Sequence, residues 1–68
     1  MKIEEAIVYL LAERGGGMKA EQIASAINAR GLHIRKDGQP VSVSQVWWAV
    51  KHFSSVFVFA EWRIMLLM

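Results

Sequence analysis

The sequence predicts a small α+β domain that is mainly helical, in which three helices are followed by a C-terminal β-hairpin. Apolar residues recur at the spacing of a helix in three successive segments. Glycines follow the first two segments and a proline precedes the third, as expected at helix boundaries. The last segment is instead rich in β-branched and aromatic residues, which favour strands. At 68 residues, the chain is expected to form a single domain, residues 1–68.

The first helix is expected over residues 3–14. Glu4 and Glu5 in its first turn and Arg14 in its last turn suit the two ends of the helix dipole. Gly15 can adopt the left-handed conformation that ends many helices. One stripe of apolar residues, which we predict to face the core, consists of Ile3, Ala6, Ile7, Leu10 and Leu11.

The second helix is expected over residues 19–30, with Gly31 as its C-cap. Its buried face is predicted to contain Met18, Ile23, Ala24 and Ile27. Residues 33–40 contain an Asp-Gly turn signal and end in a proline. They are expected to form a surface loop that carries two basic residues, Arg35 and Lys36.

The third helix is expected to begin near Ser42 or Ser44, either of which can cap it, and to end at about residue 52 or 53. Its inward stripe is predicted to consist of Val43, Val46, Val50 and Phe53, with Trp47 and Ala49 on the borders. Trp48 falls on the opposite side, which should be solvated. A large apolar ring on that side is the unusual feature of this helix.

The C-terminal residues are expected to form a hairpin. Residues 56–59 and 62–66 have the composition of strands, and Ala60 and Glu61 lie between them. Neither of these two residues is of the Asn-Gly type that favours a tight turn. Both strands carry apolar side chains on both faces. One face is expected to cover the domain's own core, and the other face needs a second cover.

This order of elements is that of a winged helix-turn-helix domain, in which the third helix enters the DNA major groove and the hairpin forms the wing. Within that fold, the chain resembles the HARE-HTH domains over nearly its whole length. The matching pieces are Ala6–Leu11, Gly16-Gly17-Met18, Glu21–Ile27, Arg30-Gly31-Leu32, Pro40, Val43–Val50, Phe57 and Trp62. The resemblance implies a role in DNA binding or in association with chromatin or restriction systems, and it brings no catalytic residues with it.

Two features depart from a DNA-binding member of this fold. The predicted wing tip, Ala60-Glu61, is acidic where a wing that reaches the DNA groove would carry Lys or Arg. The third helix has Lys51 as its only firm cation, and it has no Arg or Asn for bidentate contacts to bases. An expectation of DNA binding that is based on the fold alone is therefore an argument by analogy.

The net charge of the chain is +2, and the positive charge is concentrated in the middle. Residues 14–52 hold six Lys and Arg against two Asp and Glu, which suits an oriented approach to a polyanion. The expected partner is double-stranded DNA, bound by Ser42, Ser44, Gln45, Trp48, Lys51, His52, Arg35 and Lys36. In the alternative interpretation, the serines cap the helix and the cations form a solvated rim.

The apolar content indicates a second kind of partner. Hydrophobic residues make up 54% of the chain, and no cysteine is present to staple so small a domain, so we expect a homodimer. Six of the seven aromatic residues fall within 16 positions. The expected interface consists of Trp48, Phe57, Phe59, Trp62, Ile64, Leu66 and Met68. In the alternative function, this surface makes the chain a protein–protein interaction module that does not bind DNA.

Several other functions are not expected. His33 and His52 have no carboxylate at a spacing that would orient them, and the chain holds one Asp and no Cys, so neither catalysis nor a metal site is predicted. No cofactor or small-molecule substrate is expected. The longest apolar runs, 6–12 and 64–68, are too short to span a membrane. The acidic start of the chain differs from a basic secretory signal, so a cytoplasmic location is expected.

Overall fold

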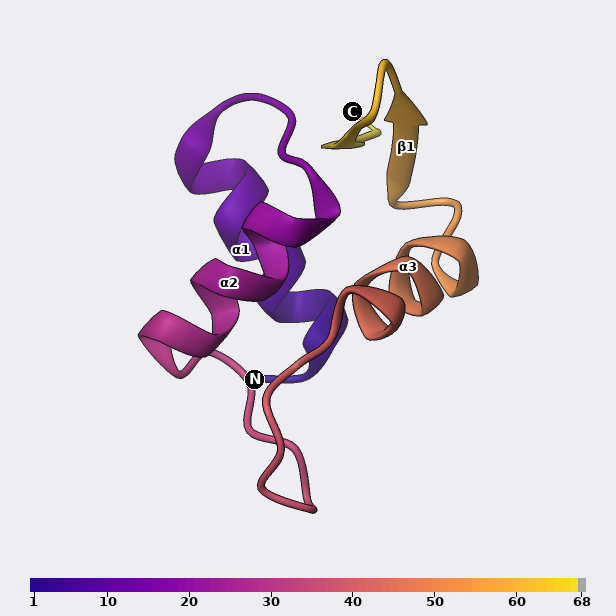
Figure 1. Ribbon diagram of the computed structural model, residues 1–68. Coiled ribbons are helices and arrows are strands. Elements are labelled where there is room, and N and C mark those ends of the chain that lie inside the picture. The colour runs from indigo at the N-terminus through magenta and orange to yellow at the C-terminus, as the bar shows by residue number, and fades with distance from the viewer. Residues whose placement is uncertain (68) are drawn as a thin grey trace.

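Three helices and a C-terminal antiparallel hairpin make up the structure, a computed structural model that describes residues 1–67 (Figure 1). The helices are α1 (Ile3–Arg14), α2 (Ala20–Arg30) and α3 (Val43–His52), and the strands are β1 (Phe57–Ala60) and β2 (Arg63–Leu66). The mainly helical α+β class and the winged helix-turn-helix layout predicted from the sequence are confirmed.

The first two helices end where their glycines predict. Gly15 and Gly31 adopt left-handed conformations, with φ of 74° and 61°, which glycine tolerates because it has no Cβ. The backbone N–H of Gly15 donates to the Leu11 carbonyl at 3.0 Å, which satisfies one of the free carbonyls of the last turn. At the start of α1, the Glu5 carboxylate accepts the backbone N–H of Lys2 at 2.9 Å.

The apolar faces of the three helices and of the hairpin meet in one core. The predicted stripe of α1 and the predicted face of α2 are buried at every position. The largest side chains that are fully buried come from α1, α2, α3 and β2: Ile7, Ile23, Ile27, Val46 and Ile64. No charged or polar residue is buried in the part of the chain that the structure describes. The core is therefore held by apolar contact.

Asn28 connects α2 to the segment that leads into α3. Its side-chain Nδ2 donates to the Val41 carbonyl at 2.9 Å, and its Oδ1 accepts the Val41 N–H at 2.8 Å. Both polar groups of the buried Val41 backbone are thereby satisfied. This pair of hydrogen bonds fixes where α3 begins relative to α2.

The predicted inward stripe of α3 is wrong at one position. Val46 and Val50 are buried and Phe53 is half-buried, but Val43 is 36% exposed. Val43 is the first residue of α3, and Val41, just before the helix, fills the core at that level. Ala49, predicted on the border of the stripe, is fully buried because its small side chain allows a close approach.

The turn of the hairpin lies one residue later than the sequence predicts. Ala60 is the last residue of β1, and the turn consists of Glu61 and Trp62, both with positive φ (53° and 65°). Two positive φ angles give the turn the twist that a two-residue hairpin needs. The prediction that Trp62 belongs to the second strand is therefore wrong, and Trp62 is exposed at the wing tip.

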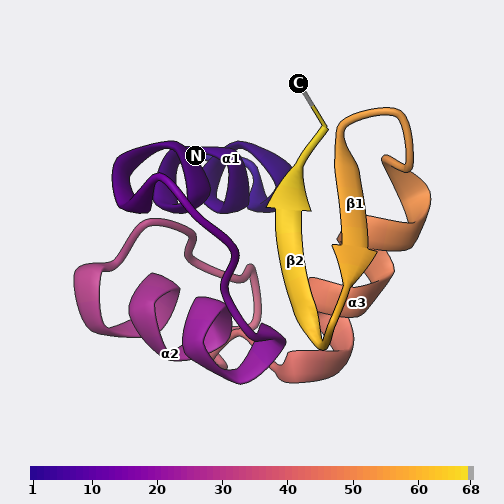
Figure 2. The same cartoon turned by 90° about the horizontal axis from the view of Figure 1, so that it is seen from above.

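The link between α1 and α2 pairs with the wing. The Met18 N–H donates to the Ile64 carbonyl at 3.0 Å, and the Ile64 N–H donates to the Met18 carbonyl at 2.7 Å. Figure 2 shows this link on the side of β2 that faces away from β1. A Cβ added to Gly17 would lie 2.8 Å from the Arg63 Cβ, so the close approach of the two backbones requires glycine. β2 is thus the central strand and β1 is an edge strand.

We expect Gly17→Ala to lower the free energy of unfolding by about 1–3 kcal/mol, because the new methyl group overlaps β2. Urea denaturation followed by circular dichroism measures the change. Gly16→Ala is the matched control, since Gly16 has open space around its Cβ position and no positive φ, and it should be neutral or slightly stabilising. Equal effects of the two substitutions would contradict the close approach.

Two valines of α3 test which side of the helix packs on the core. Val46→Ala should cost roughly 2 kcal/mol, because it removes two buried methyl groups and leaves a cavity. Val43→Ala should change stability by less than about 0.5 kcal/mol, since this position is exposed. Thermal melting of both variants measures the difference. A larger loss of stability for Val43→Ala than for Val46→Ala would contradict the structure and favour the inward stripe predicted from the sequence.

Candidate functional site

The start of α3 brings together three of the residues predicted to bind DNA. The Ser42 hydroxyl accepts the backbone N–H of Gln45 at 3.2 Å, and the Gln45 side-chain oxygen accepts the Ser42 N–H at 3.3 Å. The same Gln45 oxygen also accepts a hydrogen bond from Arg35 at 3.1 Å. These side chains cap the helix and fix the preceding loop, so each of them already makes a hydrogen bond within the chain.

The charge of Arg35 is balanced by a neighbour. Its guanidinium makes an ion pair with Asp37 at 2.6 Å. The backbone N–H of Gln39 lowers the pKa of Asp37 below its usual value, and Arg35 adds to the effect. Asp37 is therefore ionised at neutral pH and offsets the positive charge of Arg35. Lys36 is exposed beside this pair.

A second ion pair joins α1 to α2. Arg30 donates to the Glu13 carboxylate, and its guanidinium lies 5.4 Å from the centre of the Tyr9 ring. The hydrogen bond from Arg30 lowers the pKa of Glu13, and Glu13 raises the pKa of Arg30 in return. Two arginines of the positive middle of the chain are thus paired with carboxylates, which weakens its attraction for a polyanion.

The outward side of α3 carries an aromatic stack. The Trp48 and His52 rings lie 4.6 Å apart and are nearly parallel, at 12°. Ser44, Trp48, Lys51 and His52 are exposed, whereas Gln45 is half-buried. α3 contains no acidic residue. This side therefore offers a flat ring surface beside a single lysine.

A second row of rings runs from α3 to the wing tip. The Trp47 and Phe59 rings meet edge to face at 4.8 Å, and Phe59 and Trp62 do so at 6.1 Å. Trp47 is 36% exposed, Phe59 44%, Trp48 57% and Trp62 79%. We call these four residues the aromatic face. The sequence placed Trp47 at the border of the buried stripe, so its membership comes from the structure.

Two residues of the predicted interface do not reach the surface. Phe57 and Ile64 are buried in the chain's own core, because they occupy the face of the hairpin that covers the helices. Leu66 is half-buried against the same core. Met68 lies outside the described residues. Trp48, Phe59 and Trp62 remain as exposed members of the predicted interface.

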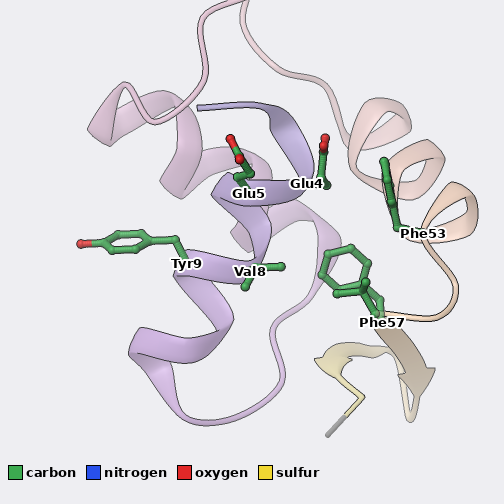
Figure 3. A pocket seen from close by; sticks show the side chains of 7 residues that line it. Glu4, Glu5, Val8, Tyr9, Phe53 and Phe57 are labelled. Carbon is green, nitrogen blue, oxygen red and sulfur yellow. The ribbon is translucent and has the colours of Figure 1, made fainter.

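A groove of about 370 Å³ lies between the first half of α1 and the segment that joins α3 to β1. Figure 3 shows Phe53 and Phe57 on one side of it and Glu4 and Val8 on the other, with the Tyr9 ring directed away. We call it the α1–α3 groove; its lining residues are Glu4, Glu5, Val8, Tyr9, Phe53, Val56 and Phe57. Its walls are largely apolar, and two carboxylates stand beside them. Sequence reasoning missed this groove because its residues come from distant parts of the chain.

Within residues 1–67, no three His, Cys, Asp or Glu side chains gather in a way that could hold a metal ion. In the same range, no helix has the length and apolar character needed to cross a membrane. Comparisons with protein-family models, with curated proteins and with solved structures gave no match. Any functional assignment therefore depends on the surfaces described above.

Proposed function

We propose that this chain is a non-enzymatic binding module that acts through protein–protein contact, and that its aromatic face binds a second copy of the chain. The observation that carries the proposal is the exposure of four large aromatic side chains on α3 and the wing. Tryptophan and other aromatic residues dominate the centres of protein interfaces, where they bury large apolar areas.

The size of the domain supports self-association. A chain of this length buries a smaller share of its surface on folding than a larger domain does, so a partner subunit would add stability to a small core. β1 is an edge strand, and two of its apolar residues, Val58 and Phe59, are exposed. An exposed apolar edge strand can pair with a strand of another chain. A second copy covers both the rings and the strand edge.

The aromatic face is tested by the mass of the protein in solution. Wild-type protein should be dimeric at high micromolar concentration in sedimentation equilibrium. Trp48→Ala should weaken dimerisation at least tenfold, because this tryptophan exposes more than half of its surface on α3. Ile34→Ala is the matched control, since Ile34 is an exposed apolar residue of the 33–40 loop outside the aromatic face. A wild-type protein that remains monomeric would contradict the proposal.

Duplex DNA binding by α3 is the second candidate. The outward side of α3 is exposed and free of carboxylates, and the resemblance to HARE-HTH domains supports the same surface. Ser44, Lys51 and His52 are available there, whereas Ser42, Gln45 and Arg35 are engaged in hydrogen bonds within the chain. With so few cations, binding to phosphates should be weak and should depend strongly on salt.

Lys51→Glu tests this second candidate. If α3 binds DNA, the substitution should remove most of the duplex affinity, and NMR shifts on titration with duplex DNA should be confined to residues 42–52 at low salt. Arg14→Glu makes the same change of charge at the end of α1 farthest from α3 (Figures 1 and 2), and it should leave most of the affinity intact. The absence of shifts at low salt would exclude DNA as the partner.

A further inference from the structure

We propose that Trp62, at the wing tip of one copy, binds in the α1–α3 groove of a second copy. This inference rests on the proposed self-association and names the surfaces that meet. It assigns a partner site to the groove, of whose lining residues only Phe57 belonged to a surface predicted from the sequence.

Trp62 is presented in a way that suits insertion. It is the most exposed large apolar side chain among the described residues, at 79%. Both turn residues have positive φ, a conformation that is strained for a bulky L-residue and that is often found at functional positions. The edge-to-face contact with Phe59 supports the ring from the side of β1. The tip therefore carries an indole in a defined position.

The α1–α3 groove matches an indole in size and character. Its volume is about 370 Å³, whereas an apolar cavity of roughly 150 Å³ is enough to bind benzene. Val8, Val56 and Phe57 provide apolar walls, and the half-buried Phe53 ring stands at one side (Figure 3). An aromatic ring placed there would contact the apolar groups of these walls.

Charge complementarity supports the same pairing. Arg63 directly follows Trp62, and Glu4 and Glu5 stand beside the groove. Arg63 is exposed and uses one guanidinium nitrogen for the Gly17 carbonyl at 3.1 Å, so its other N–H groups are available to a carboxylate. When Trp62 enters the groove, its neighbour Arg63 is brought close to these two glutamates.

A second copy must supply the Trp62 that enters the groove, because the chain's own wing tip lies at the other end of the hairpin. Phe57, which lines the groove, begins β1, and Trp62 follows the end of that strand. At about 3.3 Å per residue, they are separated by roughly 13 Å or more. Two copies with antiparallel wings place each tip at the base of the other wing. The contact is then reciprocal and closes as a two-fold dimer.

Complementary variants test the pairing directly. Trp62→Ala removes the inserted ring and leaves the groove intact, whereas Val8→Lys blocks the groove and leaves the ring intact. Each variant alone should self-associate at least tenfold more weakly than wild type in sedimentation equilibrium. An equimolar mixture of the two variants should associate at least threefold more tightly than either alone, because one intact ring meets one intact groove.

Circular dichroism melts establish that both variants fold, and Glu4→Lys with Glu5→Lys serves as a second groove variant that leaves the apolar walls unchanged. A dimer that is weakened by Trp48→Ala but not by Trp62→Ala or Val8→Lys would overturn this inference and leave the proposed function in place. A mixture no tighter than its components would also overturn it. A monomeric wild-type protein would overturn both proposals.

Discussion

The backbone pairing of Met18 with Ile64 is the constraint on which the presentation of the wing depends. Two hydrogen bonds join the α1–α2 link to the buried centre of β2, and Gly17 allows the two segments to approach. A two-stranded hairpin alone is marginally stable in water. The third segment holds the hairpin on the helices by its backbone as well as by its side chains. The position of Trp62 at the wing tip therefore depends on this pairing.

The helices could be predicted from the sequence because their signals are local. Apolar spacing and the glycines at positions 15 and 31 act within a few residues of where they stand. Val43 shows where local reasoning ends: its angular position on α3 faces inward, but the helix begins there and Val41 takes the space. The hydrogen bonds of Asn28 could not be predicted for the same reason, since their partner Val41 is 13 positions away in the sequence. Such contacts exist only after α2 and α3 have packed.

The hairpin was predicted as an element, but its register and its surface were not. Ala60, Glu61 and Trp62 carry no turn signal, and the register of the structure, with Phe57 opposite Leu66 and Phe59 opposite Ile64, is not specified by these three residues. A shift of one position moves Trp62 from a strand to an exposed tip. The groove was equally hidden, because its walls come from α1 and from residues 53–57. The sequence thus predicted aromatic residues of the candidate surface, but it did not predict how they are arranged or that a groove lies near them.

The two candidate functions make different demands on the wing. A dimer that buries both wing tips in the grooves of opposite copies leaves no wing for a DNA groove, and Glu61 already disfavours that contact. Ser44 and Lys51, which are exposed on α3 beside the aromatic rings, are then the groups left for nucleic acid on each copy. Dimerisation doubles these few cations and relates them by a two-fold axis, the symmetry of a palindromic site. The proposed self-association would therefore serve both candidate functions, because it would cover exposed aromatic rings and bring together cations that are few on a single copy.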